Sequence, residues 1–267
     1  MTLGKTLAIL GLLGAIGTTA SVPAAADSFS DIKEAGKVRV AIDLASPPNG
    51  MLDAGLKPVG SDVETAELLA KDWGVQLELV QTTGATRIPN LQTNKADIVI
   101  STLAVTPERK QVIAFSKPYS GQLSMVAAQS SLDIKDWADL KGKVVTVCRG
   151  TTQDTDMTKR AEEFGYTMAR YDDEGAMVTA AVSGQATIVA SSEALIKQIA
   201  GKSKANPFEP KFTIRVFDLA IGARKNEPEL LAALDRWVSD NLENGKLNDI
   251  YRRHHGHALP KEIIEGK

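Results

Sequence analysis

Residues 97–109 read D-I-V-I-S-T-L-A-V-T-P-E-R, which predicts a buried strand followed by a helix start. Residues 98–100 form a short apolar, β-branched run, typical of a strand buried on both faces of a parallel sheet. The small polar residues Ser101 and Thr102 follow where such a strand would end. Residues 106–109, T-P-E-R, then supply a hydroxyl N-cap, proline at the first helical position and an acid in the first turn.

This succession places three polar side chains at one edge of the predicted sheet. Open α/β sheets bind ligands in the crevice beyond the carboxyl ends of their strands. The hydroxyls of Ser101 and Thr102 and the guanidinium of Arg109 would therefore share one crevice. Such a set is suited to binding a small carboxylate, since a guanidinium can donate two parallel hydrogen bonds to it.

Strands and helices alternate on the N-terminal side of this segment. We expect a strand over residues 38–42, a helix over 62–73 with Asp62 as its N-cap, and a second strand over 76–80. This alternation is typical of an α/β sheet with parallel strands.

The same pattern begins again in the second half of the chain. We expect a strand over residues 144–148, a glycine turn and helix over 150–164, and a buried strand over 188–190 that ends in two serines. Two similar α/β units would thus be joined near residues 120–124. The chain, at 267 residues, is long enough for two modest domains.

Composition and charge limit the classes of partner. The chain is 43% hydrophobic and 24% charged, which is ordinary for a globular protein. Its formal net charge of -2 gives no reason to expect nucleic acid or an anionic membrane surface as a partner. We expect a monomer that uses no cofactor.

Residues 1–26 have the features of a cleavable secretory signal peptide. Lys5 supplies a positive charge, residues 7–16 form an apolar run, and residues 24–26 offer an A-x-A cleavage site. The apolar run is too short and too broken to be a good membrane-spanning helix. We therefore expect the mature protein to be soluble in the periplasm.

Two residue types that often carry chemistry have simpler explanations here. Cys148 is the single cysteine, so no intrachain disulfide can form, and its strand-like context predicts a small buried side chain. His254, His255 and His257 suggest a metal, but no partner carboxylate or cysteine pattern supports one. We expect these histidines to lie at a solvated helix end and predict no metal site.

Several motifs follow one another along the chain: V-R-V-A-I-D…S-P-P at 38–48, G-S-D-V-E at 60–64, R-I-P-N-L-Q-T at 87–93, the segment 97–119, D-L-K-G-K-V-V at 139–145, R-G-T-T-Q-D at 149–154 and the segment 226–251. In the same order, they resemble those of the polar amino-acid-binding periplasmic (solute-binding) proteins of ABC importers, bacterial extracellular solute-binding protein family 3. The resemblance covers essentially the whole mature chain.

The resemblance implies an α/β, two-lobed type II periplasmic binding protein fold. Each lobe would be a Rossmann-like sheet flanked by helices, and two hinge crossovers would join the lobes. Residues 27–122 and 218–267 would form lobe 1, and residues 123–217 would form lobe 2.

The resemblance also implies which residues hold the carboxylate of a ligand. Arg109 matches the arginine that pairs with the ligand α-carboxylate in this family. Ser101 and Thr102 match positions that take the ammonium and carboxylate through hydroxyl and carbonyl oxygens. Thr151 and Thr152 match the G-T-T loop of the second lobe that completes the carboxylate clamp. A helix start offers free N–H groups to an anion, although a plain N-cap would explain a threonine there as well.

The second lobe departs from the family pattern at Ser192. The family usually has an aspartate there, which pairs with the α-ammonium, whereas a serine carries no charge. Three alternatives remain open: Glu193 reaches into the site, neutral oxygens hold the ammonium, or the ligand is not an ordinary α-amino acid.

Arg87 and Asp43 are two further candidates. Arg87 matches a pocket-wall position that is apolar in some basic-amino-acid binders, whereas glutamate and aspartate binders have a similar R-I-P motif. One hypothesis is that Arg87 pairs with a second carboxylate of an acidic ligand, and the alternative is a surface arginine at a helix start. Asp43, just past the first strand, would offset Arg87 or bind a donor.

Three functions are compatible with the implied fold. The first is capture of an amino acid or related small carboxylate for an inner-membrane ABC permease, with lobe closure as the signal. The second is a cyclohexadienyl or arogenate dehydratase-like enzyme, but we expect no His, Lys or second carboxylate beside Glu193 to form an acid/base pair. The third is a sensory input module, for which the sequence lacks a second apolar spanning segment. We favour transport and expect no catalysis.

Overall fold

The computed structural model describes residues 28–265, and its central element is one mixed sheet of eight strands. The strand order is β5-β1-β6-β11-β7-β10-β8-β9. These strands are β1 (Lys37–Ile42), β5 (Gln76–Gln81), β6 (Ile98–Val99), β7 (Ala114–Gln129), β8 (Val144–Cys148), β9 (Thr167–Tyr171), β10 (Ile188–Ser192) and β11 (Phe208–Ala223). A small antiparallel sheet contains β2 (Ala45–Ser46), β3 (Gly50–Leu52) and β4 (Pro58–Val59).

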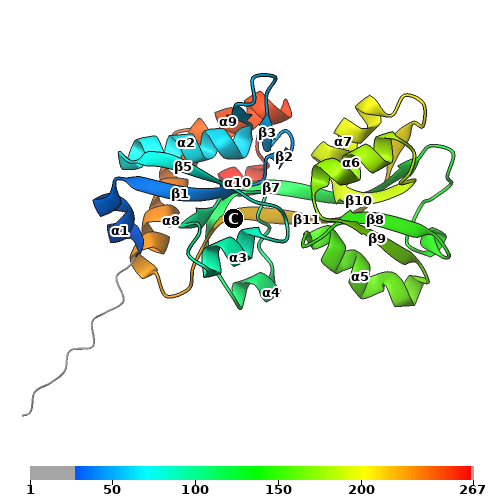
Figure 1. The fold of residues 1–267 in the computed structure, drawn as a ribbon, viewed down its shortest axis with the longest axis horizontal. Coiled ribbons are helices and arrows are strands. Elements are labelled where there is room, and N and C mark those ends of the chain that lie inside the picture. The colour runs from blue at the N-terminus through cyan, green and yellow to red at the C-terminus, as the bar shows by residue number, and fades with distance from the viewer. Residues whose placement is uncertain (1–27, 266–267) are drawn as a thin grey trace, which may run out of the picture.

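The helices gather into two lobes at the two ends of the large sheet, as Figure 1 shows. Lobe 1 contains β1, β5 and β6 with α1 (Ser28–Ala35), α2 (Ser61–Trp73), α3 (Arg87–Gln92), α4 (Pro107–Lys110), α8 (Pro228–Glu243), α9 (Lys246–His255) and α10 (Lys261–Ile264). Lobe 2 contains β8, β9 and β10 with α5 (Thr152–Phe164), α6 (Glu174–Val182), α7 (Glu193–Lys202) and a short 3-10 helix at Ala138–Leu140. The expected α/β architecture with two lobes is confirmed.

Two long strands, β7 and β11, connect the lobes. They pair antiparallel along their whole length, from Ala223 opposite Ala114 to Phe208 opposite Gln129. In lobe 1 β6 pairs with β11, and in lobe 2 β10 pairs with β7, both antiparallel. The sheets of the lobes are therefore continuous through the hinge, because each crossover strand is long enough to belong to both.

The predicted lobe boundaries, at residues 122/123 and 217/218, fall inside β7 and β11. The division of the chain at those residues stays a prediction. Within each lobe the other strands are parallel: β1 pairs with β5 and β6, and β8 pairs with β9 and β10. The alternating sequence pattern therefore correctly predicts parallel strands inside the lobes. It does not predict the antiparallel pairing of the hinge strands β7 and β11.

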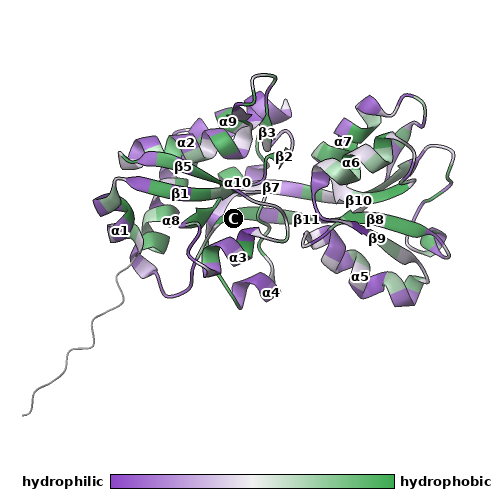
Figure 2. Ribbon diagram, in the orientation of Figure 1, coloured by the Kyte–Doolittle hydropathy of each residue, from purple (hydrophilic) through white to green (hydrophobic). Residues whose placement is uncertain are grey.

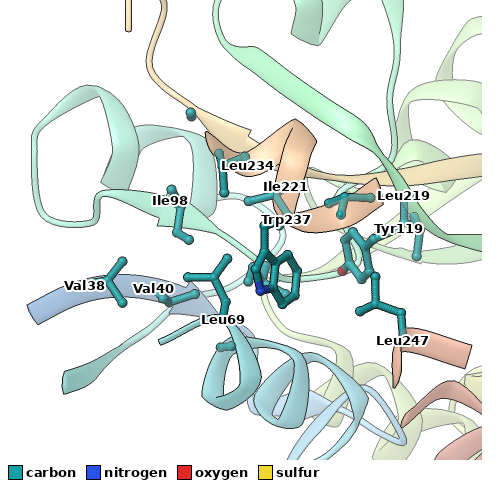
Figure 3. Packing of buried hydrophobic residues seen from close by; sticks show 14 of the residues in the cluster. Val38, Val40, Leu69, Ile98, Tyr119, Leu219, Ile221, Leu234, Trp237 and Leu247 are labelled. Atoms are coloured by element: carbon teal, nitrogen blue, oxygen red, sulfur yellow. The ribbon is translucent and has the colours of Figure 1, made fainter. Parts of the chain in front are cut away.

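Lobe 1 is built on a core between its sheet and the helices α2 and α8. Strands such as β1 and β8 are mostly hydrophobic, whereas α4 is mostly hydrophilic (Figure 2). Side chains from the sheet and both helices converge in this core (Figure 3), among them Val38, Val40, Leu69, Ile98, Ile221, Leu234 and Trp237. Lobe 2 has separate clusters around Met177 and Leu195 and around Leu140 and Met157. This burial fixes the strand ends that carry the site.

The start of α2 differs from the prediction. Its N-cap is Gly60, not Asp62. Gly60 has a φ of 130°, and an added Cβ would lie 2.3 Å from the Asn49 carbonyl oxygen, so only glycine fits there. Asp62 instead lies within the first turn of α2, and its carboxylate turns into the protein.

Of the expectations for Cys148, for membrane spans and for the signal peptide, the structure addresses the first two. Cys148 is 2% exposed among apolar side chains of lobe 2, as predicted, and burial raises the pKa of its thiol. Residues 28–265 contain no helix long and apolar enough to cross a membrane. The predicted signal peptide, residues 1–26, lies outside the described residues.

Replacing Leu69 by alanine tests the assignment of the lobe 1 core. Leu69 is fully buried, so Leu69→Ala should lower the free energy of unfolding by about 2–5 kcal/mol. Urea denaturation followed by circular dichroism measures this loss. Leu56 is 76% exposed, and Leu56→Ala should cost less than about 0.5 kcal/mol. Equal losses in the two variants would contradict the assigned core.

Candidate functional site

The candidate residues meet where the carboxyl ends of the strands of the two lobes face each other. In lobe 1 Asp43 follows β1 and Ser101 follows β6, while in lobe 2 Thr151 follows β8. An added Cβ at Gly150, in the loop after β8, would lie 2.7 Å from the Ala85 Cα atom in the loop after β5. The two lobes are therefore in contact at the edge where open α/β sheets bind ligands.

Arg109 joins the lobes at this edge. Thr106 caps α4, since its Oγ1 accepts from the Arg109 backbone N at 3.2 Å, and Pro107 is the first helical residue. The guanidinium Nη1 donates to the Ala104 carbonyl of lobe 1 at 2.9 Å. Nη2 donates to the Gly150 carbonyl of lobe 2 at 3.1 Å. The predicted helix start thus holds a guanidinium between the lobes.

The charge of Arg109 has no counter-ion in the described structure. The ion pairs formed by residues 28–265, with N···O distances of at most 4.0 Å, include neither Arg109 nor Arg87. Burial, and then the nearby Arg87 cation, lower the pKa of Arg109 to about 9. Both effects destabilise the positive charge of Arg109, and a bound anion would stabilise it.

Two further contacts hold the lobes in this arrangement. Glu108 of α4 and Lys159 of α5 form an ion pair of 2.7 Å, with both side chains 57% exposed. Gly150 has a φ of 75°, and its Cβ position is occupied by the backbone of residues 84 and 85. The exposed ion pair contributes little by itself, so the close approach at Gly150 is the stronger constraint.

Ser101 and Thr102 lie at the end of β6 and are tied into a hydrogen-bond network. The Asp43 backbone N donates to Ser101 Oγ at 3.0 Å. Arg87 Nη1 donates to the Ser101 carbonyl at 2.6 Å and more weakly to the Thr102 carbonyl at 3.4 Å. Thr102 has a φ of 44°, which is uncommon for a non-glycine residue and marks a constrained turn.

Asp62 stabilises this turn, a role that sequence reasoning missed. Its Oδ2 accepts from the Thr102 backbone N at 2.9 Å, and its Oδ1 accepts from the Tyr119 hydroxyl at 2.8 Å. Burial raises the pKa of Asp62 to about 6, and the two hydrogen bonds oppose that rise. The sequence signal for this role is an acidic residue among the apolar residues of α2. A residue that only caps the helix need not be buried.

Thr151 and Thr152 form the start of α5 in lobe 2. Thr151 is the N-cap: its Oγ1 accepts from the Asp154 backbone N at 3.2 Å and its hydroxyl donates to the Cys148 carbonyl at 2.7 Å. Thr152 donates to Gln153 Oε1 at 3.3 Å, and both side chains are buried. Gln153 Nε2 has no hydrogen-bond partner among residues 28–265. The capping explanation for Thr151 therefore holds.

Arg87 is buried among acidic side chains instead of lying on the surface. It is 4% exposed, which excludes the surface-arginine alternative. Burial lowers its pKa, and the carboxylates of Glu174, Asp43 and Asp62 oppose that change. Burial in turn raises the pKa of Asp43, while the Ala45 backbone N–H and Arg87 lower it. Asp43 therefore does offset Arg87, together with Glu174, which sequence reasoning did not single out.

Ser192 and Glu193 lie beside the hinge, at the start of α7. They line a cavity of about 220 Å³, which we call the hinge-side cavity, together with residues 121–123 and Tyr251. Ser192 Oγ accepts from the Leu195 backbone N at 3.3 Å and so caps α7. Glu193 pairs with Lys197 at 2.8 Å and shares this cavity with His255, so the expectation that no Lys or His lies beside Glu193 is wrong. Arg109, Thr102 and Thr152 are not among the residues that line this cavity.

The expectation of a solvated histidine cluster is wrong for two of its members. His254 is half-buried and pairs with Glu64 at 2.7 Å. His255 is also half-buried, lines the hinge-side cavity and stacks on Tyr251 with ring centroids 4.0 Å apart. Burial lowers the pKa of His255 to about 4, so its ring is neutral at pH 7. These rings are half-buried because α9 packs against α2 and borders the hinge-side cavity.

The family model for bacterial extracellular solute-binding proteins, family 3, matches residues 38–257. The chain belongs to this family. The resemblance found in the sequence motifs is thereby confirmed over most of the described residues.

Named relatives in this family include amino-acid-binding proteins. The lysine/arginine/ornithine-binding periplasmic protein of Escherichia coli (strain K12) is 28% identical over 258 residues, covering 94% of this chain and 96% of that protein. A mutant of ArgBP from T. maritima superimposes with a TM-score of 0.79 at 27% identity, covering 86% of this chain and 100% of that one. The ancestral amino acid-binding protein AncCDT-1, a precursor of cyclohexadienyl dehydratase, has a TM-score of 0.77 at 28% identity, covering 85% and 99%.

Removing the Tyr119 hydroxyl tests the support of the Thr102 turn. Tyr119→Phe leaves the buried Asp62 carboxylate with one donor fewer, so we expect a loss of about 1–3 kcal/mol of stability. This donor favours the charged form of Asp62, whose pKa is about 6. The loss should therefore be largest above pH 6 and shrink as the carboxyl becomes protonated at pH 5.

Urea unfolding of the wild type and Tyr119→Phe at pH 5 and pH 8 measures this loss. Tyr171→Phe is a matched control, since the Tyr171 hydroxyl makes no hydrogen bond within the described part of the chain. An equal loss at both pH values, or the same loss in Tyr171→Phe, would contradict the role of Asp62.

Proposed function

We propose that this protein is the periplasmic amino-acid-binding component of an ABC importer. As a monomer, it captures an amino acid or related small carboxylate between its lobes and delivers it to an inner-membrane permease. One observation carries the proposal: Arg109 is a cation that contacts both lobes and has no carboxylate partner among residues 28–265. The carboxylate of a ligand would supply the missing negative charge. The lysine/arginine/ornithine-binding relative from Escherichia coli and the ancestral amino acid-binding protein AncCDT-1 support the ligand class.

The start of α5 supplies the second half of the carboxylate site. Thr152 and Gln153 directly follow the N-cap Thr151, and the first N–H groups of a helix have no partner within it. These groups and the positive end of the helix dipole favour an anion. A carboxylate at Arg109 would therefore be bound by a side chain from lobe 1 and by the helix N-terminus of lobe 2.

This division of the site couples ligand binding to closure. Open lobes would separate Arg109 from Gly150 and from the start of α5, so a ligand would lose half of its contacts. A ligand that binds the closed arrangement better than the open one shifts the population toward closure. The permease can then distinguish loaded from empty protein by shape.

Binding without catalysis is part of the proposal. In the dehydratase alternative Glu193 would be the acid, yet Glu193 is engaged by Lys197 at 2.8 Å and faces the hinge-side cavity. The carboxylate-binding groups Arg109 and Thr152 lie outside the lining of that cavity. This separation supports a site that holds a ligand and releases it unchanged.

Replacing Arg109 by alanine tests the proposed function. The purified protein is screened against common amino acids, opines and small dicarboxylates by thermal shift, since a ligand that binds only the folded state raises the melting temperature. Isothermal titration calorimetry then gives the Kd of the best ligand. Losing two charge-assisted hydrogen bonds, each worth about 1.5–3 kcal/mol, should weaken binding by about 100-fold or more in Arg109→Ala.

Arg252→Ala provides the control, since Arg252 is a 56% exposed arginine on α9 and its loss should leave the Kd unchanged. Unchanged affinity in Arg109→Ala would overturn the proposed site. The absence of any ligand in the screen, followed by turnover of prephenate or arogenate, would instead favour the dehydratase function.

A methyl group at Gly150 tests the link between closure and binding. In Gly150→Ala the added Cβ would lie 2.7 Å from backbone atoms of lobe 1, so the closed arrangement cannot form unchanged. If the closed fraction falls about tenfold, the apparent Kd rises about tenfold. Small-angle X-ray scattering with ligand should then show a less compact protein than the wild type.

Gly142→Ala is the matched control. Gly142 has a φ of 71°, close to the 75° of Gly150, but no atom lies within 4 Å of its Cβ position. The two variants share the backbone cost of alanine at positive φ and differ in the interlobe clash. Equal affinities in Gly150→Ala and Gly142→Ala would show that closure does not depend on the contact at Gly150.

A further inference from the structure

Two buried polar atoms near the interlobe contact have no partner. Arg87 is 4% exposed, and its Nε atom has no hydrogen-bond acceptor among residues 28–265. Glu174, the first residue of α6 in lobe 2, has a buried Oε2 atom that lacks a donor within the same residues. An unpaired buried polar atom is costly and rare in native proteins. Both atoms lie at the contact between the lobes, where a group from outside the chain can pair with them.

Glu174 is half-buried, and its Oε2 atom is fully buried, where α6 packs against β2 of lobe 1. The Ser46 hydroxyl of β2 in lobe 1 acts on its carboxyl group by lowering the pKa that burial raises. An added Cβ at Gly175 would lie 3.7 Å from the Ala45 Cβ atom, so the start of α6 packs on β2. Asp173 caps α6 by accepting from the Ala176 backbone N at 2.7 Å, which fixes the first turn. Glu174 is thus a carboxylate of one lobe that the other lobe shields from water.

The charged groups around Glu174 leave an excess of negative charge. Asp43 and Arg87 act on it from lobe 1, and Asp173 acts on it from its own lobe. The Cys148 thiol, at the end of β8, lies close enough to be affected by Glu174 and is neutral at pH 7 because burial raises its pKa. Arg87 is therefore one cation facing several carboxylates, and a cation from a ligand would balance them.

Arg87, Asp43 and Glu174 follow strands at or next to the edges of the sheet, away from the hinge strands. The hinge strands β7 and β11 are central in the strand order, and Ser101 follows β6, which is next to β11. Arg87 and Glu174 follow the two edge strands, β5 and β9, and Asp43 follows β1 beside β5. A ligand whose carboxylate lies at Arg109 would extend its side chain toward these edges.

We propose that Glu174 receives the positively charged end of the ligand side chain and thereby selects amino acids with a guanidinium or ammonium group. This inference rests on the proposed function. In this arrangement Arg87 donates to the Ser101 carbonyl and favours the charged forms of Asp43 and Glu174. An acidic ligand, in contrast, would bring a further carboxylate against Glu174 and Asp43.

Arginine and citrulline are the matched ligands for the test, because a guanidinium and a neutral ureido group have nearly the same size. Calorimetric titration at pH 8 should show that the wild type binds arginine about 10–100-fold more tightly than citrulline, as expected for a hydrogen-bonded charge pair. Glu174→Gln keeps the length of the side chain and removes its charge. It should reduce this ratio to about one while changing the Kd of citrulline by less than about threefold.

Glu163→Gln is the control variant. Glu163 is an exposed residue of α5, so this substitution makes the same change in net charge in the same lobe. It should leave the ratio of the two dissociation constants unchanged. Melting temperatures of the variants confirm that each is folded before binding is compared.

Proton release supplies a second measurement of the same contact. Burial, and then Asp43, raise the pKa of Glu174 to about 7, so part of the protein carries a proton there at pH 7. A bound cation favours the charged form, so arginine should bind with proton release and more weakly at pH 6 than at pH 8. Titrations in phosphate and in Tris, which differ in ionisation enthalpy, measure the protons released. Glu174→Gln should abolish that release.

The outcomes separate this inference from the proposed function. A wild-type preference for glutamate over arginine, or an unchanged arginine-to-citrulline ratio in Glu174→Gln, would overturn the role of Glu174. Either result would leave amino-acid binding at Arg109 intact. Failure of the wild type to bind any amino acid would reject the proposed function itself.

Discussion

The arrangement of the two lobes depends on the guanidinium of Arg109, which donates to Ala104 at 2.9 Å and to Gly150 at 3.1 Å. Carbonyl oxygens accept these bonds without neutralising the charge, and the neighbouring Arg87 repels it. The chain therefore holds a cation between its lobes that its own residues stabilise incompletely. Gly150 makes the contact possible, because any larger side chain would collide with the loop of lobe 1. An anion bound at this point would strengthen the contact between the lobes, which is what a closing binding protein requires.

Charge is distributed along the interlobe region in a way that suits a zwitterion. At the contact between the lobes the site offers Arg109 and the N-terminus of α5 to a carboxylate. Beyond the ends of β1 and β9 it offers the carboxylates of Asp43 and Glu174, and Arg87 interacts with both. Buried charges are stable only when they are paired. A ligand with a carboxylate at one end and a cation at the other would pair with Arg109 and with the carboxylates at the same time.

Local sequence features predicted the parts of the fold that depend on nearby residues. Thr106 caps α4 as the T-P-E-R motif predicts, and β6 (Ile98–Val99) lies within the apolar run that precedes Ser101. The misread residues depend on distant contacts. Asp62 fits an N-cap pattern, yet it bonds Thr102 and Tyr119, which are 40 and 57 residues away. Glu174 opens an ordinary helix, and only the packing of that helix start on β2 across the lobes makes it part of the site. The continuous sheet likewise follows from pairing between β7 and β11, which a linear pattern does not reveal.

A crystal structure of the protein with its tightest-binding amino acid tests the central claim most directly. The account predicts closed lobes and a ligand carboxylate within hydrogen-bonding distance of the Arg109 guanidinium and the start of α5. A ligand found in the hinge-side cavity beside Tyr251 and His255, or with its carboxylate turned away from Arg109, would contradict the account.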